Sequence, residues 1–115
     1  MEPILLVLTN VPDREAALRL ADGLVKTRLA ACVNILAECT SVYRWSGAVE
    51  TASEVPLFIK TRAALFPEVE AFILSHHPYE VPEFIALPVR GGSLAYLEWL
   101  VQETRTLPPG AVESS

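Results

Sequence analysis

The chain has 115 residues, of which 51% are hydrophobic, and its 9 basic and 14 acidic side chains give a formal net charge of −5. A chain of this length buries roughly two-thirds of the surface that its unfolded form exposes, so it can fold as one domain without a disulfide or a metal. The acidic balance disfavours proteins that hold nucleic acid or anionic lipid by counterion release. We therefore expect partners among small molecules, cations and proteins.

The lengths of the apolar runs and the spacing of the two cysteines indicate where in the cell the protein is expected to reside. The longest apolar runs, residues 4–8 and 29–33, fall far short of the roughly 20 residues that a membrane-spanning helix needs, and the first residues lack the basic start of a signal peptide. Cys32 and Cys39 would stand about 23 Å apart on one extended strand, at ~3.3 Å per residue, which is too far for a disulfide. We expect reduced thiols, a cytoplasmic protein and no membrane association.

The first half of the chain predicts a strand, a helix and a long hairpin. The apolar run 4–9 is typical of a short strand buried on both faces. Asp13 is a capping residue for a helix that carries an apolar stripe up to about residue 29. Residues 32–36 and 40–45 are rich in β-branched and aromatic side chains, and a Ser-Gly turn leads into residues 48–61. This pattern predicts a long β-hairpin.

The second half predicts a helix, a strand and a last helix. Pro67 begins the first of these helices and Pro78 ends it, residues 84–89 form the strand, and Ser93 caps the last helix. The order β-α-β-β-α-β with an added C-terminal helix predicts an α+β fold, the ferredoxin-like split β-α-β sandwich. We place this domain at residues 1–106. Residues 107–115 are rich in Pro, Gly and Ser and predict a disordered tail.

The hairpin is longer than the strands that flank it. Each arm has about 13 residues and spans roughly 43 Å, whereas a flanking strand covers roughly 20 Å. An exposed tip with Val42, Tyr43, Trp45 and Val49 would be an aggregation-prone edge unless another chain pairs with it. A closed ring of identical chains solves this problem. We therefore expect a homo-oligomer.

The densest polar cluster is HHPYEVPE, residues 76–83. Imidazoles and carboxylates together suit Cu, Zn or Ni. His77 precedes a proline, which pushes it out of the helical region and lets it turn independently of His76. The alternative is that His76 continues the apolar stripe and packs at the helix end, where its charged form favours the helix dipole. The spacing matches no structural zinc site.

Other polar residues have two interpretations each. Glu80 and Glu83 suit an acid and base pair, although carboxylates between prolines are usually solvated. Lys60 follows three apolar residues and either reaches solvent or points at an anion. Cys32 resembles a small buried hydrophobe. The sequence contains no local nucleophile motif and no glycine-rich phosphate loop, so we expect a non-enzymatic protein.

Five segments together resemble the CutA family, the divalent-cation tolerance proteins. The match runs in the family's order over residues 4–103, which makes it specific. The segments are AACVNI at 30–35, SVYRWSG at 41–47, IKT at 59–61, HHPYEVPE at 76–83 and YLEWL at 96–100.

The resemblance implies a homotrimer of ferredoxin-like subunits whose hairpins wrap around their neighbours. It also implies a response to metal ions and binding of divalent cations, copper above all, with His76 and His77 as the ligands. In some members a cysteine at the end of the first strand completes a copper site, and Thr9 stands at that position here. Because a hydroxyl replaces a soft thiolate poorly, we expect weaker binding of Cu(II) by imidazoles. We expect the trimer to persist without metal.

Family members are also similar to the trimeric PII signalling proteins, which hold small ligands in clefts between subunits. In this alternative, Trp45, Lys60, Tyr79 and Glu83 line an inter-subunit pocket for a small anionic or zwitterionic effector. An enzyme that uses Glu83, Lys60 or His77 for proton transfer is supported by neither the motifs nor the family. The remaining alternative is a structural trimer that anchors another protein.

Overall fold

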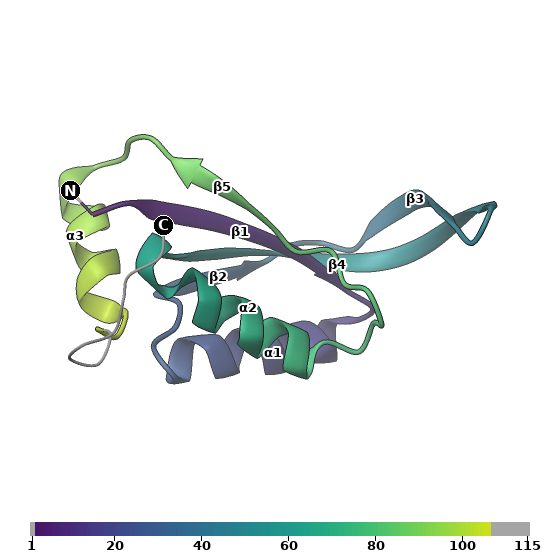
Figure 1. Cartoon of the computed structure of the whole chain (residues 1–115), viewed down its shortest axis with the longest axis horizontal. Helices are drawn as coiled ribbons and strands as arrows, with labels where there is room; N and C mark the ends of the chain where they lie inside the picture. The colour runs from purple at the N-terminus through teal and green to yellow at the C-terminus, as the bar shows by residue number, and fades with distance from the viewer. Residues whose placement is uncertain (1, 107–115) are drawn as a thin grey trace.

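The computed structural model describes residues 2–106, so the predicted tail at 107–115 lies outside the described residues. The described part forms one five-stranded sheet with helices packed against it (Figure 1). The strands are β1 (Ile4–Val11), β2 (Cys32–Ile35), β3 (Cys39–Trp45), β4 (Ala48–Arg62) and β5 (Ile85–Val89). The helices are α1 (Arg14–Lys26), α2 (Phe66–His76), which follows a 3-10 turn at Ala63–Leu65, and α3 (Leu94–Glu103).

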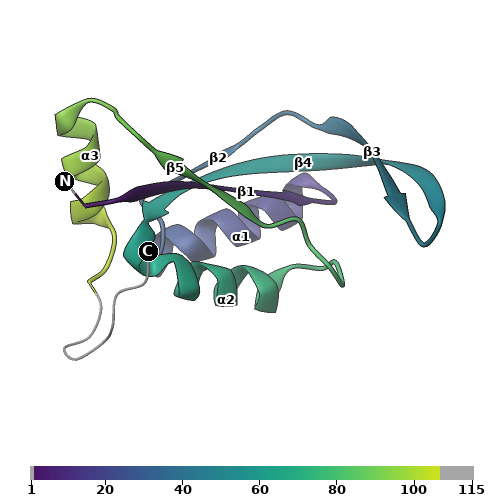
Figure 2. The same ribbon diagram turned by 45° about the horizontal axis from the view of Figure 1, so that its top comes forward.

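The sheet is antiparallel in the order β2-β4-β1-β5, and β3 pairs with β4 beyond β2. At its centre Val7 lies opposite Ile59 on one side and Ala86 on the other. Helices α1 and α2 lie side by side under one face (Figure 2). The predicted β-α-β-β-α-β order with a C-terminal helix is present. Residues 36–38 break the first hairpin arm into β2 and β3.

Helix α1 is shorter than its apolar stripe predicts. Its cap is the expected one, because the Asp13 carboxylate accepts a hydrogen bond from the Ala16 N–H at 2.8 Å. Leu20 and Leu24 are buried against the sheet. The helix ends at Lys26 rather than near residue 29, because Arg28 has a φ of 61° in the left-handed region, which breaks the helical path.

The prediction that the first strand is buried on both faces is wrong for this chain. Val7 and Val11 face the helices and are fully buried, but Leu6 and Leu8 on the opposite face are only half-buried. Helices α1 and α2 pack on one side only, and α3 stands at the end of the sheet (Figures 1 and 2). The second face therefore remains open in the described residues. We call it the open sheet face; its large apolar members are Leu6, Leu8, Phe58, Ile85 and Leu87.

The predicted overhang of the hairpin is confirmed (Figure 1). Strand β4 has 15 residues, and β1 pairs with it only from Val55 onward. Residues 48–54 therefore have β3 as their one partner strand within residues 2–106. The turn is tight because Ser46 and Gly47 both have positive φ, 50° and 81°, the pattern of a two-residue hairpin turn. Strand β3 begins at Cys39, one residue earlier than expected, and both cysteines are free thiols.

The two ends of the described chain meet at a buried arginine. Arg62, at the end of β4, is 4% exposed and donates a hydrogen bond from Nε to Thr104 Oγ1 at 2.9 Å. Its other nitrogens reach the Glu2 carboxylate and the Arg105 carbonyl. These contacts hold the end of α3 against the sheet. Within residues 2–106, every helix is too short or too polar to cross a membrane.

Candidate functional site

A large cleft lies between the hairpin and the loop that follows α2. Its volume is about 790 Å³, within the usual range for small-molecule sites. The hairpin forms one wall, loop residues 78–83 form the other, and the end of β1 closes the base. The lining residues are Asn10, Ser41, Val42, Tyr43, Trp45, Ala52, Glu54, Pro78, Tyr79, Glu80, Val81 and Glu83.

Strand register explains why the hairpin wall is continuous. Alternate residues of a strand point to the same face, so Tyr43 and Trp45 of β3 share a face. Cys39 lies opposite Glu54 and Ser41 opposite Ala52 in the β3–β4 pairing, which places Glu54 on that same face. On this face, the hairpin therefore contributes the Glu54 carboxylate and the rings of Tyr43 and Trp45 to the cleft lining.

The cleft is acidic. Its lining includes the carboxylates of Glu54, Glu80 and Glu83 and no Lys, Arg or His side chain. Glu54 is 9% exposed, whereas Glu80 and Glu83 are open to solvent. A concave surface with one sign of charge and partly apolar walls focuses its field. The cleft therefore attracts cations and repels anions.

Tyr79 contributes the loop's aromatic ring to the cleft. Burial is the largest cause that raises the pKa of Tyr79 to about 12, and a hydrogen bond with the neighbouring Glu54 carboxylate and the charge of that carboxylate contribute to the same rise. The phenol is therefore a neutral hydrogen-bond donor at physiological pH.

Three side chains anchor the loop to the end of β1. Thr9 is buried, and its Oγ1 donates to the Glu83 carbonyl at 2.6 Å. Asn10 Nδ2 donates to Glu83 Oε1 at 3.4 Å. The Asn10 carbonyl in turn accepts a hydrogen bond from His77 Nε2 at 2.7 Å. Thr9, for which the resemblance implied a lost metal ligand, thus positions the loop.

Both nitrogens of the His77 ring are occupied. His77 is 9% exposed as a residue, and its ring packs against Tyr79 with 4.9 Å between ring centroids. Besides the bond from Nε2 to Asn10, its Nδ1 accepts the backbone N–H of Tyr79 at 3.1 Å. His77 leaves the helix with a ψ of 135°, as expected for a residue before proline. In this position the imidazole has no lone pair free for a metal.

His76 faces a different neighbourhood. It is exposed and stacks on Phe72 with 4.1 Å between centroids, and its Nδ1 lies 2.8 Å from the Phe72 carbonyl. His76 therefore packs against its own helix at the end of α2 but stays exposed, and it does not extend the buried stripe of Val69 and Ile73. Residues 2–106 contain no group of three or more His, Cys, Asp or Glu placed to hold a metal. A metal shared by His76 and His77 stays a prediction, and it requires His77 to give up one of its hydrogen bonds.

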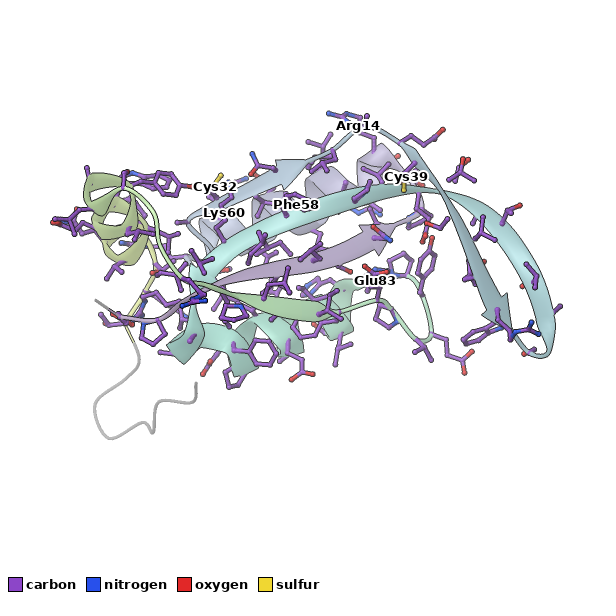
Figure 3. The ribbon with its side chains drawn as sticks, turned by 90° about the horizontal axis from the view of Figure 1, so that it is seen from above. Arg14, Cys32, Cys39, Phe58, Lys60 and Glu83 are labelled. Atoms are coloured by element: carbon purple, nitrogen blue, oxygen red, sulfur yellow. The ribbon has the colours of Figure 1, made fainter. Side chains whose placement is uncertain are left out.

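Lys60 lies outside the cleft. It is on the open sheet face, opposite Cys32 in the β2–β4 pairing, and its Nζ is 5.9 Å from the Tyr96 ring centroid. Figure 3 shows Lys60 near Cys32 and Phe58 and well apart from Glu83. Of the four residues predicted to share a pocket, Trp45, Tyr79 and Glu83 line one cleft. Within a single chain Lys60 does not join them.

Sequence reasoning missed Glu54 and Asn10. Glu54 is an acidic residue directly before the apolar half of β4, and a buried carboxylate is unusual enough to indicate a site. The side chain of Glu54 points into the cleft because Glu54 pairs with Cys39, and the sequence does not predict this strand register. Asn10 follows what looked like the end of the first strand, and only the longer β1 brings it to the loop.

The hydrogen bonds of the histidines predict opposite tautomers. His77 should carry its proton on Nε2 and His76 on Nδ1, because each of these atoms faces a carbonyl oxygen. Long-range ¹H–¹⁵N correlation spectra of the imidazoles at pH 8 measure this directly. A Nδ1-protonated His77 would contradict the geometry described above.

The environment of Tyr79 predicts a late step in a phenol titration. Ultraviolet absorbance should show one tyrosine with a pKa of about 12, which Tyr79→Phe removes and which Glu54→Gln moves down, although burial keeps it above the ordinary 10.0. Because the folded chain keeps this proton to higher pH than the unfolded chain does, its contribution to stability is complete below pH 10 and is lost as the pH rises toward 12. Tyr43→Phe, a change in the same cleft, should leave the late step in place.

Comparisons with known proteins agree with the fold. The family described as CutA1 divalent ion tolerance protein matches residues 5–103. A rice relative named "Protein CutA 1, chloroplastic" is 48% identical over 103 residues, which cover 90% of this chain and 58% of the relative. "Divalent-cation tolerance protein CutA" of Thermus thermophilus is 46% identical over 98 residues, or 85% of this chain and 95% of that protein.

The solved structure of CutA1 from Oryza sativa has a TM-score of 0.88 and 47% sequence identity, and the match covers 90% of this chain and 95% of that chain. Because the chain spans little more than half of the curated rice protein, the comparison concerns the domain rather than that whole protein. A family match over most of the chain, close relatives and the same mixed α/β fold agree with one another. The chain therefore belongs to the CutA1 family of divalent ion tolerance proteins.

Proposed function

We propose that this chain is a non-enzymatic divalent-cation tolerance protein that binds divalent metal ions, copper among them, in the response to metal ions. The family match over residues 5–103 supports the tolerance role, and the Thermus thermophilus relative is named a divalent-cation tolerance protein. The acidic cleft, with three carboxylates and no basic side chain in its lining, supports an affinity for cations. The metal is cargo rather than part of the fold, since the core is built from apolar side chains.

The histidines are the proposed copper ligands. His76 fits this role as it stands, because its exposed ring uses Nδ1 for the Phe72 carbonyl and Nε2 remains available in the described structure. His77 fits it only if its ring turns away from Asn10 or Tyr79. Thr9 adds no soft ligand, because it is buried and donates to Glu83. These conditions favour Cu(II) on imidazole with modest affinity.

A calorimetric Cu(II) titration at neutral pH tests the ligand assignment. The wild type should bind about one ion per chain, and His76→Ala/His77→Ala should weaken binding at least about tenfold, the equivalent of roughly 1.4 kcal/mol. Affinity should fall at about pH 5, where imidazoles carry protons that compete with the metal.

The matched control for this titration is Glu80→Gln/Glu83→Gln, which changes two exposed cleft carboxylates and leaves both imidazoles. If the glutamate variant loses copper and the histidine variant keeps it, the cleft and not the histidine pair is the metal site. Equal binding by all three proteins would refute both assignments.

We also propose that the chain works as a homotrimer. Thirteen large apolar side chains are exposed among residues 2–106. Among them, Ile85 and Leu87 lie together on the open sheet face and Trp45 lies on the hairpin, and contiguous exposed apolar surface of this kind marks an interaction site. Both edges of the outer hairpin lack a further partner strand within residues 2–106, so they offer backbone hydrogen bonds to another chain. The number three follows the resemblance to the CutA family.

Two matched leucines test the assembly. Leu87 on the open sheet face is 49% exposed and Leu18 on α1 is 54% exposed. Light scattering should give three times the chain mass for the wild type and for Leu18→Glu, whereas Leu87→Glu should dissociate the trimer because a buried carboxylate is costly. The wild type should remain trimeric in a chelator. A monomeric wild type, or a trimeric Leu87→Glu variant, would contradict the proposed interface.

A second candidate function is PII-like signalling through a small effector bound in the cleft. The cleft volume of about 790 Å³ and the presence of Trp45, Tyr79 and Glu83 in its lining favour this alternative. In a pocket that contains all four predicted residues, Lys60 would come from a neighbouring subunit.

The proposed compartment is the cytoplasm, on the strength of the two free thiols, although the rice relative carries "chloroplastic" in its name.

A further inference from the structure

We propose that Thr9 lowers the metal affinity of this chain by fixing loop 78–83 in a conformation in which His77 cannot bind a metal ion. A metal at His77 and a loop fixed to β1 are then mutually exclusive states. This inference rests on the proposed function, with His77 among the copper ligands, and specifies how that site is regulated. Thr9 is in this role a positioning residue and not a ligand.

The His77 ring has a single lone pair, and the loop already uses it. In a neutral imidazole one nitrogen donates a hydrogen bond and the other accepts one. Nε2 faces the Asn10 carbonyl at 2.7 Å and must donate, so Nδ1 carries the lone pair, which accepts the backbone N–H of Tyr79 at 3.1 Å. A metal ion needs that same lone pair. The first hydrogen bond of the loop therefore occupies the atom that a metal would use.

Every route to a metal-bound His77 breaks the bond from the Tyr79 N–H. A metal at Nδ1 takes the lone pair directly. A metal at Nε2 removes the bond to Asn10 and moves the ring proton to Nδ1, where one donor would face another. Rotation of the ring away from its partners loses both bonds. Because this hydrogen bond is partly buried, the freed N–H meets water only if the start of the loop moves.

Thr9 fixes the far end of the same loop. The residue is 1% exposed, and its Oγ1 donates to the Glu83 carbonyl at 2.6 Å. Asn10 adds a longer contact from Nδ2 to Glu83 Oε1 at 3.4 Å. Two of the six loop residues are prolines, which fix φ, so the loop has few free dihedral angles with which to move at one end alone. Release of the loop at His77 therefore strains its attachment to Thr9.

The loop and the metal compete for His77, which gives their coupling a definite sign. An interaction that stabilises only the fixed loop lowers metal affinity by the same factor by which the metal weakens that interaction. Without the Thr9 hydroxyl, the Glu83 carbonyl loses its donor in the fixed loop, whereas in the released loop it meets water. Loss of the hydroxyl should therefore tighten metal binding. A Thr9 hydroxyl that served as a metal ligand would have the opposite effect.

Release of the loop also changes the cleft. Loop 78–83 forms one of its walls, and the Tyr79 ring packs against the His77 ring with 4.9 Å between centroids. A metal at His77 displaces this wall. The shape of the cleft therefore distinguishes the metal-loaded chain from the metal-free chain.

A calorimetric Cu(II) titration of threonine variants of the full-length chain tests the proposal. Thr9→Val should bind copper about three- to tenfold more tightly than the wild type, the range that one hydrogen bond supports. Thr9→Ser keeps the hydroxyl and should bind like the wild type. Unchanged or weaker copper binding by folded Thr9→Val would overturn the proposal.

Thr61→Val is the matched control for this titration. Thr61 is equally buried, and its Oγ1 donates to the Leu29 carbonyl at 2.6 Å, but it pairs with Leu5 near the start of β1 and far along the strand from Thr9. The variant should lose stability in urea without a change in copper affinity. Tighter copper binding by Thr61→Val would show that general destabilisation, and not the loop, raises the affinity, which would also overturn the proposal.

Hydrogen–deuterium exchange followed by mass spectrometry locates the release. Copper should speed exchange in peptides that cover loop 78–83, because the Tyr79 N–H loses its acceptor, and it should leave peptides of the central sheet unchanged. His77→Ala should abolish this acceleration. Exchange in the loop that copper slows or leaves unchanged would contradict the competition between metal and loop.

The two levels of inference fail in different ways. If His76→Ala/His77→Ala binds copper like the wild type, the proposed ligands are wrong, and this inference is wrong with them. If the histidine variant loses copper while Thr9→Val binds no more tightly than the wild type, the proposed ligands stand and this inference alone is rejected.

Discussion

The difference in length between two paired strands determines most of this structure. Strand β4 has 15 residues and β1 has 8, and the pairing ends where Val11 meets Val55. Up to that point β4 is a central strand with apolar residues against the helices. Beyond it, β4 can pair only with β3, and the two strands leave the sheet as a hairpin (Figure 1). The overhang produces the unpaired edges and one wall of the cleft, so the proposed assembly and the proposed ligand binding depend on the same feature.

Charge and apolar surface are separated in the folded chain. The cleft side of the hairpin contains Glu54 and faces Glu80 and Glu83, whereas Lys60 lies on the open sheet face beside Tyr96. A single chain thus presents an acidic concave site and an apolar sheet face that carries Lys60. This arrangement explains how four residues that resemble one pocket in the sequence fall on two surfaces of one subunit.

The sequence predicted the order of elements because local signals mark each one. The Asp13 and Ser93 caps, the Ser46-Gly47 turn and Pro78 all act within a few residues of themselves, and the excess length of the hairpin follows from counting residues. The predictions that were wrong concern features that depend on contacts between distant parts of the chain. The stripe of α1 continues past Lys26, but Arg28 adopts a left-handed conformation and bonds through its side chain to the carbonyls at the end of α3. The apolar run of β1 indicates burial without showing that helices cover one face only.

In the candidate site, too, local sequence signals predict some features and long-range contacts determine the others. The composition of residues 76–83 alone predicts a functional loop, and Pro78 predicts that His77 leaves the helix. The sequence by itself determined the fold class, the hairpin and the presence of imidazoles, phenol and carboxylates in this loop, because short-range backbone preferences and residue spacing specify them. Only the tertiary structure decided that His77 and Thr9 hold the loop, that Glu54 completes the cleft and that Lys60 stands apart. The reason is that strand register and long-range hydrogen bonds join residues more than 60 positions apart, such as Thr9 with Glu83 and Asn10 with His77.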